Sequence, residues 1–181
     1  MMHYNAKNLW LILLLFLSNP AYSGAIILGL NIEAIESRFT EEGFDFGFGV
    51  QGGYEFKDFK SWHFGALFEF MNGVLDEDDL DTVGEMTYKS KSLFATARPG
   101  DWPVIFKVGI VDADYKILED DITRNFREVS DTGYAYGVAL SFGGDAFRLN
   151  LLDFKRVKIG NDSFDSYGIS IAVFLGPAGF N

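Results

Sequence analysis

Hydrophobic and polar positions alternate with period two along much of the chain. In residues 44–56 every second side chain is large and apolar, and the positions between them hold glycine, acidic residues or glutamine, with one glycine at position 52 on the large face. An extended strand places such a pattern on two faces, whereas a helix does not. The same alternation recurs in residues 61–71, 102–111, 134–142 and 167–175. The sequence therefore predicts five clear β-strands.

Three further segments alternate more weakly. Residues 25–36 and 147–151 follow the same period, and residues 87–98 are strand-like with an ambiguous assignment of their two faces. The chain is therefore predicted to be all-β with eight strands.

The two faces of these strands differ in size, which decides how a barrel would be oriented. One face carries Phe, Tyr, Trp and branched aliphatic residues, and the other carries Gly, Ala, Ser and isolated charges. Eight strands enclose a lumen just wide enough for side chains to fill it, and ten or more inward Phe and Trp would overfill it. Because an apolar outer face requires lipid, we predict an eight-stranded antiparallel up-and-down transmembrane β-barrel. A soluble lipocalin-like barrel, with the large residues inside, is an alternative.

The connections between the predicted strands alternate in length. Short turns are expected at 57–60, 99–101 and 143–145, and long loops at 36–43, 73–86, 112–132 and 156–165. Short periplasmic turns and longer external loops are typical of outer-membrane barrels. We expect one aromatic girdle at the short turns, with Tyr54, Phe56, Trp62 and Trp102, and another at the loops, with Phe44, Tyr88, Tyr134, Tyr136 and Tyr167.

Residues 1–23 have the pattern of a secretory signal peptide. Lys7 precedes the apolar run 9–17, and Ala21 and Ser23 are small residues where a signal peptidase reads the chain. This run is shorter than the ~20 residues that a membrane-spanning helix needs. We expect export and cleavage before Gly24, leaving residues 24–181 as the barrel domain; a short anchor helix is the alternative.

Several polar residues fall on the face that should point into the lumen. Because an unpaired buried ion costs several kcal/mol, these charges are expected to pair with one another. We predict a structural network that plugs the pore, in which Lys107 or Arg148 contacts a glutamate. Its members are Glu33, Glu55, Glu69, His63, Lys107 and Arg148, completed by Asn31, Gln51 and Asn150.

Composition excludes several functions. The net charge of −11 repels a phosphate backbone, so no nucleic acid is expected as a partner, and the absence of Cys removes disulfides and thiolate chemistry. Most acidic residues fall in the long loops, where a solvated rim is preferred over divalent-cation bridges to lipopolysaccharide. Residues 76–81 lack the spacing of an EF-hand, and the glycine-rich residues 47–52 lie inside a strand. We therefore expect no metal ion and no cofactor.

The last predicted strand carries the most specific local pattern. Residues 166–173, Ser-Tyr-Gly-Ile-Ser-Ile-Ala-Val, resemble the terminal-strand signal that the barrel assembly machinery reads. With the architecture of residues 24–181, this chain resembles the small outer-membrane β-barrels of the OmpA and OmpX type. It departs from many members by continuing past Leu175 with residues 176–181.

The resemblance implies a place in the outer membrane of a Gram-negative cell. The expected partners are outer-membrane lipid, lipopolysaccharide and, during biogenesis, the assembly machinery, and a monomer is expected. The expected role is structural or in surface interaction, without enzymatic activity. A porin-like channel for small solutes is one alternative. A lipid A-modifying enzyme is another, but His63 is the sole candidate base after export and the Ser61-x-His63 order reverses that of the deacylases.

Overall fold

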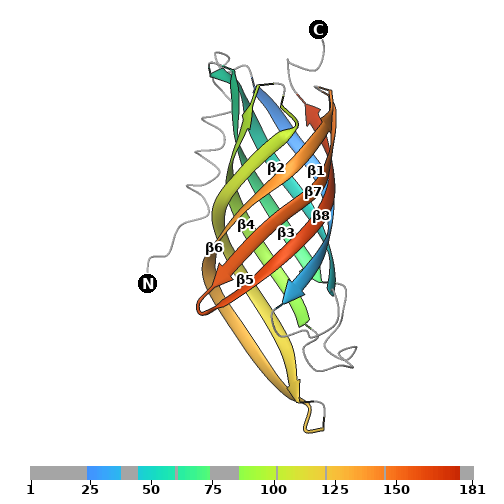
Figure 1. Ribbon diagram of the computed structural model, residues 1–181, viewed down its shortest axis with the longest axis vertical. Helices are drawn as coiled ribbons and strands as arrows, with labels where there is room; N and C mark the ends of the chain where they lie inside the picture. Colours follow the sequence, from blue (N-terminus) through green and yellow to red (C-terminus); the bar gives the residue numbers. More distant parts are fainter. Residues whose placement is uncertain are drawn as a thin grey trace.

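The computed structural model describes residues 24–37, 45–59, 61–73, 86–100, 102–120, 122–144 and 146–175. These residues form eight antiparallel strands that close into a barrel (Figure 1). The strands are β1 (Gly24–Ser37), β2 (Asp45–Phe59), β3 (Trp62–Gly73), β4 (Met86–Pro99), β5 (Val104–Asp120), β6 (Asn125–Gly143), β7 (Phe147–Ile159) and β8 (Asp162–Leu175). The predicted all-β, eight-stranded, up-and-down barrel is confirmed. The proposed signal peptide (1–23), most of the loops 36–43 and 73–86, Phe44 and the tail 176–181 lie outside the described residues.

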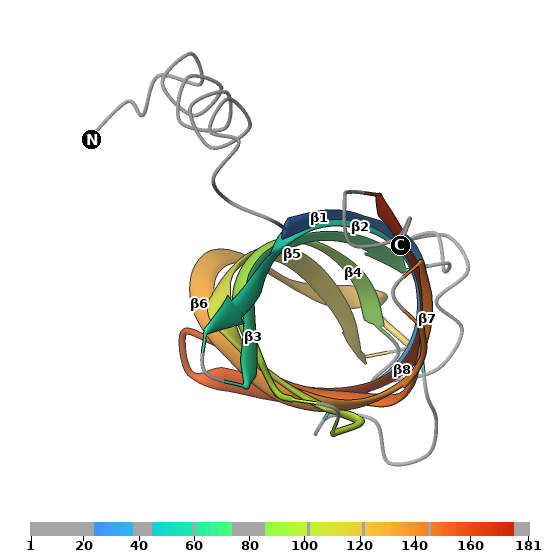
Figure 2. The ribbon, with the colours of Figure 1, turned by 90° about the horizontal axis from the view of Figure 1, so that it is seen from above.

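Each strand pairs with its neighbours in sequence, and β1 also pairs with β8 from Ile26↔Leu175 to Ser37↔Phe164. Figure 2 shows the resulting ring of strands in the view along the barrel. Among the described residues there is no helix with the length and apolarity needed to cross a membrane.

Large apolar side chains cover the outside of the barrel, as the size difference between the two strand faces predicts. Leu30 is 65% exposed and Ile110 is 60% exposed, whereas the inward-facing Phe94 is 1% exposed. We call this outward surface the apolar belt. Its members include Ile26, Leu28, Leu30, Ile32, Phe46, Phe48, Val50, Phe64, Phe68, Phe70, Leu93, Phe106, Val108, Ile110, Phe142, Ile169, Ile171 and Val173.

The structure shows which residues of β4 point into the barrel, an assignment that the sequence leaves open. Ser90, Ser92 and Phe94 point inward and are buried, whereas Leu93 points outward. The outward placement predicted for Tyr88 is wrong, because its ring is buried and lies 5.0 Å from the ring of Phe164. The other described aromatic residues expected at the loop rim, Tyr134, Tyr136 and Tyr167, are exposed.

Two of the predicted long loops are also wrong, because the strands continue through them. Strands β5 and β6 pair as far as Asp120↔Asn125, and β7 and β8 as far as Ile159↔Asp162. In Figure 1 the β5–β6 hairpin extends furthest from the short turns.

The physical reason is an inversion of polarity along β5. From Val104 to Ile110 the large residues point outward, but beyond this point Ala113, Tyr115 and Ile117 are buried inside while Asp112 and Asp114 are exposed outside. Period two is therefore retained while the face that carries the apolar side chains changes. A pattern of large residues on the outer face alone ends at Ile110.

Strand β7 contains a β-bulge between Asn150 and Asp153. Leu152 has a φ of 51°, a left-handed conformation that residues with a β-carbon seldom adopt, and its side chain is exposed. The extra residue changes the parity of the strand. Arg148 and Asn150 are buried before the bulge, and Asp153 and Lys155 are buried after it.

Candidate functional site

A layer of ion pairs crosses the middle of the lumen. The ammonium of Lys107 lies 3.0 Å from a carboxylate oxygen of Glu69 and 2.6 Å from one of Asp153. Lys155 lies 2.6 Å from the second oxygen of Glu69 and also pairs with Glu33. All five side chains are at least 95% buried. We call these residues the ion layer.

Two members of the ion layer, Asp153 and Lys155, were missed by the sequence analysis. With strict period two after Asn150, residues 153 and 155 would point outward, so the bulge hides them. The available signal was the pair of charges Asp153-x-Lys155 next to the outward apolar residues of β7, since isolated charges on a lipid-facing surface are costly.

Other inward-facing polar residues make room for the ion layer, bind to it or pair with one another. The amide of Asn31 donates to Glu33 at 3.1 Å. A β-carbon at Gly168 would lie 2.8 Å from Cγ of Glu33, so glycine at this position admits the glutamate side chain. The side-chain amide of Asn150 donates to the hydroxyl of Ser170 at 2.8 Å.

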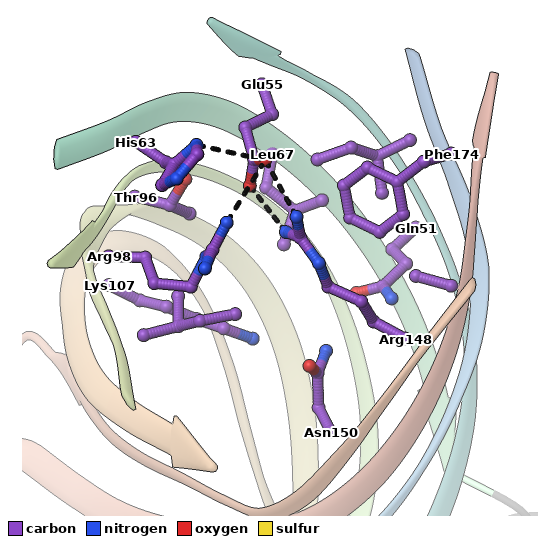
Figure 3. A pocket seen from close by; sticks show the side chains of 13 residues that line it. Gln51, Glu55, His63, Leu67, Thr96, Arg98, Lys107, Arg148, Asn150 and Phe174 are labelled. Atoms are coloured by element: carbon purple, nitrogen blue, oxygen red, sulfur yellow. Dashed lines mark hydrogen bonds and ion pairs between the residues drawn. The ribbon is translucent and has the colours of Figure 1, made fainter. Parts of the chain in front are cut away.

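A second charged group lies nearer the short turns, around Glu55 (Figure 3). Two nitrogens of Arg148 donate to the two oxygens of Glu55 at 2.7 and 3.0 Å, a bidentate pair. Arg98 and His63 each lie 3.7 Å from Glu55. The six predicted network residues are therefore divided: Glu33, Glu69 and Lys107 meet in the ion layer, and Glu55, His63 and Arg148 meet here.

Both arginines are positioned by further contacts. The guanidinium of Arg148 lies 4.2 Å from the centre of the Phe174 ring, a cation–π arrangement. Arg98, which the sequence analysis did not select, donates to the carbonyl oxygen of Gly100 at 2.6 Å. These groups line a cavity of about 30 Å³, which we call the short-turn pocket. Its walls are Ile27, Gln51, Glu55, His63, Leu67, Thr96, Arg98, Ile105, Lys107, Arg148, Asn150, Ala172 and Phe174.

The opposite end of the lumen is filled by apolar side chains, which we call the apolar cap. The rings of Tyr88 and Tyr115 lie 5.0 and 6.2 Å from that of Phe164. Burial, together with a hydrogen bond to Asp162, raises the pKa of Tyr115 above its ordinary value. The cap also contains Ile35, Met86, Ile117 and Ile159, all buried.

The chemistry offered by these groups is charge pairing. In the parts of the chain that the structure describes, no three His, Cys, Asp or Glu side chains are grouped to hold a metal ion. His63 faces Glu55 in the lumen, and Ser61 is an exposed turn residue whose carbonyl accepts a hydrogen bond from Gly100.

A closed antiparallel barrel of eight strands, apolar outside and charged within, has the fold of the small outer-membrane β-barrels. No protein-family model matches this chain, and no curated protein matches it. Among solved structures, the barrel is similar to Ail, the attachment invasion locus protein of Yersinia pestis, with a TM-score of 0.56 and 15% identity, over 85% of this chain and 99% of that chain. Ail in complex with the heparin analogue sucrose octasulfate aligns with a TM-score of 0.55 and 16% identity over the same shares. The N-terminal barrel domain of Pseudomonas aeruginosa OprF aligns with a TM-score of 0.49 and 11% identity, over 81% of this chain and 97% of that chain.

Proposed function

We propose that this chain is exported to the outer membrane of a Gram-negative cell and serves there as a non-enzymatic barrel with a structural or surface-interaction role. The single observation that carries the proposal is the apolar belt around a charged lumen. Residues such as Leu30, Val108 and Ile110 are more than half exposed on the outside. A continuous apolar surface of this kind is unfavourable in water and favourable in lipid.

The membrane location is tested by fractionating cells that express the full chain. We expect the protein in the outer-membrane fraction, soluble only with detergent, and migrating differently in gels before and after heating. A protein recovered from the periplasm in monodisperse form without detergent contradicts the proposal.

We further propose that the lumen is plugged and does not conduct. The ion layer and the apolar cap support this, because they fill successive levels of the barrel with buried side chains. In planar bilayers the purified protein should give no stepwise conductance. Regular open-channel steps, changed in size by Lys107→Ala and unchanged by Lys158→Ala on the outer wall, would support the porin-like alternative.

The absence of enzymatic activity is proposed on the environment of His63. Its imidazole lies inside the barrel beside Glu55, where an acyl chain in the membrane does not reach it. The mass of lipid A should be the same in cells with and without the protein. A mass change that disappears with His63→Ala and persists with His3→Ala contradicts the proposal.

Lipopolysaccharide and membrane lipid are the proposed partners of the outer wall. Exposed Lys91 pairs in register with Phe70 of the apolar belt. Exposed Lys89 lies two residues further along β4 on the same face, paired with Asn72. Both lysines therefore lie at the edge of the belt. Ammonium groups at this level match lipid A phosphates. The stabilisation of the purified barrel by added lipopolysaccharide should decrease in Lys89→Gln/Lys91→Gln and should persist in Ser130→Gln.

A further inference from the structure

We propose that the outer wall of β4 and β5 binds a phosphoethanolamine group carried by lipid A, a zwitterion with a phosphate and a primary ammonium. The inference rests on the proposed function, because it requires the barrel to lie in the outer membrane with its short turns in the periplasm. The site consists of exposed cations on β4 beside exposed anions on β5. We call it the charge ladder, and its members are Lys89, Lys91, Asp112 and Asp114.

The charges of the ladder stand in register but do not pair with one another. The register partners are Lys89↔Asp114 and Lys91↔Asp112. In the part of the chain that the structure describes, none of these side chains takes part in an ion pair or a side-chain hydrogen bond. Opposite charges in register do pair further out on the same wall, where the ammonium of Lys116 lies 3.3 Å from a carboxylate oxygen of Glu128. The charge ladder therefore presents a column of cations and a column of anions that are both open to a ligand.

The two columns match a zwitterion in sign and in spacing. Opposite side chains on neighbouring antiparallel strands have β-carbons about 4.5–5.5 Å apart. The two-carbon link of phosphoethanolamine separates its phosphate from its ammonium by about 5 Å. The phosphate accepts charge-assisted hydrogen bonds from the lysines, and the ammonium donates them to the aspartates. A phosphate without an ammonium meets the lysines but is repelled by the neighbouring carboxylates, so the zwitterion is the better ligand.

The apolar belt begins at the next outward pair and explains why the carrier is a lipid. This pair is Leu93↔Ile110, whose side chains are 50% and 60% exposed. Further along β4, Ala97 lies in register between Phe64 of β3 and Phe106 of β5. A small side chain between two large ones leaves room for an acyl chain along β4. A lipid that lies on the belt thus brings its charged head to the ladder, and at the end opposite the periplasmic turns that lipid is lipid A.

The experiment measures lipid A binding to the purified full chain in a non-ionic detergent at constant pH and ionic strength. Lipid A with and without phosphoethanolamine, identical in acyl chains, is titrated, and the shift of the unfolding midpoint gives the apparent Kd. We expect the phosphoethanolamine form to bind about fivefold more tightly, the size of effect that an exposed ion pair contributes. Phosphatidylethanolamine and phosphatidylcholine are titrated in parallel.

Two double variants have opposite expected effects on unmodified lipid A. Asp112→Asn/Asp114→Asn should abolish the preference for the phosphoethanolamine form and should tighten the binding of unmodified lipid A, because the carboxylates that repel its phosphates are removed. Lys89→Gln/Lys91→Gln should weaken the binding of both forms. Glu128→Gln, exposed on β6 outside the charge ladder, is the matched control and should retain the native preference.

The native protein provides a second measurement that does not depend on the folding of a variant. Amide NMR shifts that appear with phosphoethanolamine lipid A and not with the unmodified form should be largest at residues 89–91 and 112–114. Equal affinities for the two forms, or a preference that persists in Asp112→Asn/Asp114→Asn, would overturn this inference and leave lipopolysaccharide binding intact. Stabilisation by phosphatidylethanolamine alone would assign the ladder to a phospholipid and overturn it as well. No stabilisation by either lipid A would overturn both proposals.

Discussion

The ammonium of Lys107 lies 2.6 Å from the carboxylate of Asp153, and this contact depends on the bulge at Leu152. Deletion of Leu152 restores strict alternation in β7 and turns Asp153 and Lys155 toward the outside. We expect the deletion variant not to fold in detergent micelles, as measured by heat-modifiable gel mobility. Leu152→Asn keeps the extra residue in a conformation that asparagine tolerates, and it should fold. A deletion variant of native stability would show that the bulge does not set the parity.

Removal of one cation from the ion layer should be strongly destabilising. Lys155→Met leaves Glu33 and Glu69 buried without one of their partners, which costs about 3–5 kcal/mol in the free energy of unfolding. The double variant Lys155→Met/Glu33→Gln should recover more than half of that loss. Urea unfolding in lipid vesicles provides the measurement, and Lys158→Met, on an exposed residue, is the matched control. Equal losses in the single and double variants would exclude charge pairing as the cause.

The edge of the apolar belt is testable with outward-facing arginines. Ile110→Arg places a charge within the belt and should destabilise the inserted barrel by about 2–4 kcal/mol. Ser130→Arg lies beyond the belt, where Ser130 pairs in register with exposed Asp114, and should change the unfolding free energy by less than about 0.5 kcal/mol. Similar effects of the two variants on unfolding in vesicles would contradict the proposed membrane boundary.

Backbone conformation distinguishes two exposed serines. Ser61 has a φ of 70° in the turn between β2 and β3, so Ser61→Gly should raise the free energy of unfolding by about 0.5–1 kcal/mol. Ser130 lies in regular β6, where Ser130→Gly should lower it by a similar amount. Opposite signs in chemical denaturation are expected; a loss in both variants would contradict strain at Ser61.

The tip of the β5–β6 hairpin contains a titratable contact. Asp120 accepts hydrogen bonds from the Thr123 hydroxyl at 2.7 Å and the Ile122 amide at 3.0 Å, which hold its pKa below the ordinary value of 3.8. Since the folded-state pKa is the lower one, the contribution of this contact to stability is present above pH 3.8 and is lost as pH falls through the folded-state value. Carboxyl NMR titration should show a higher pKa in Thr123→Ala and no change in Ser130→Ala. An unchanged pKa in Thr123→Ala would contradict this role of the hydroxyl.

Local alternation was sufficient to predict the barrel and its orientation. The contrast between residues such as Phe48 and Gly49 repeats along the clearest strands, and it depends only on the pleat of a single strand. Inward placement of Glu69 and Lys107 follows from the same rule.

Other features depend on a β-bulge, on contacts between strands and on a change of the apolar face, none of which follows from alternation within one strand. The bulge at Leu152 hides Asp153 and Lys155, because one extra residue exchanges the two faces of a strand. An aromatic residue near a rim predicts a girdle position for Tyr88, whereas its ring packs on Phe164 in the apolar cap. The extensions of β5 and β6 have a polar outer face, and their sequence therefore predicts a loop.

The change of face along β5 divides this strand into a segment suited to contact with lipid and a segment suited to contact with water. Beyond Ile110 the wall continues with Asp112 and Asp114 outside and Ala113 and Tyr115 inside, so this part is organised like a water-soluble sheet around its own core. In the proposed membrane location, a change in bilayer thickness is therefore expected to alter the environment of the belt and to leave the packing of the cap intact. In β5 the energetic cost of hydrophobic mismatch is thus confined to the segment that ends at Ile110.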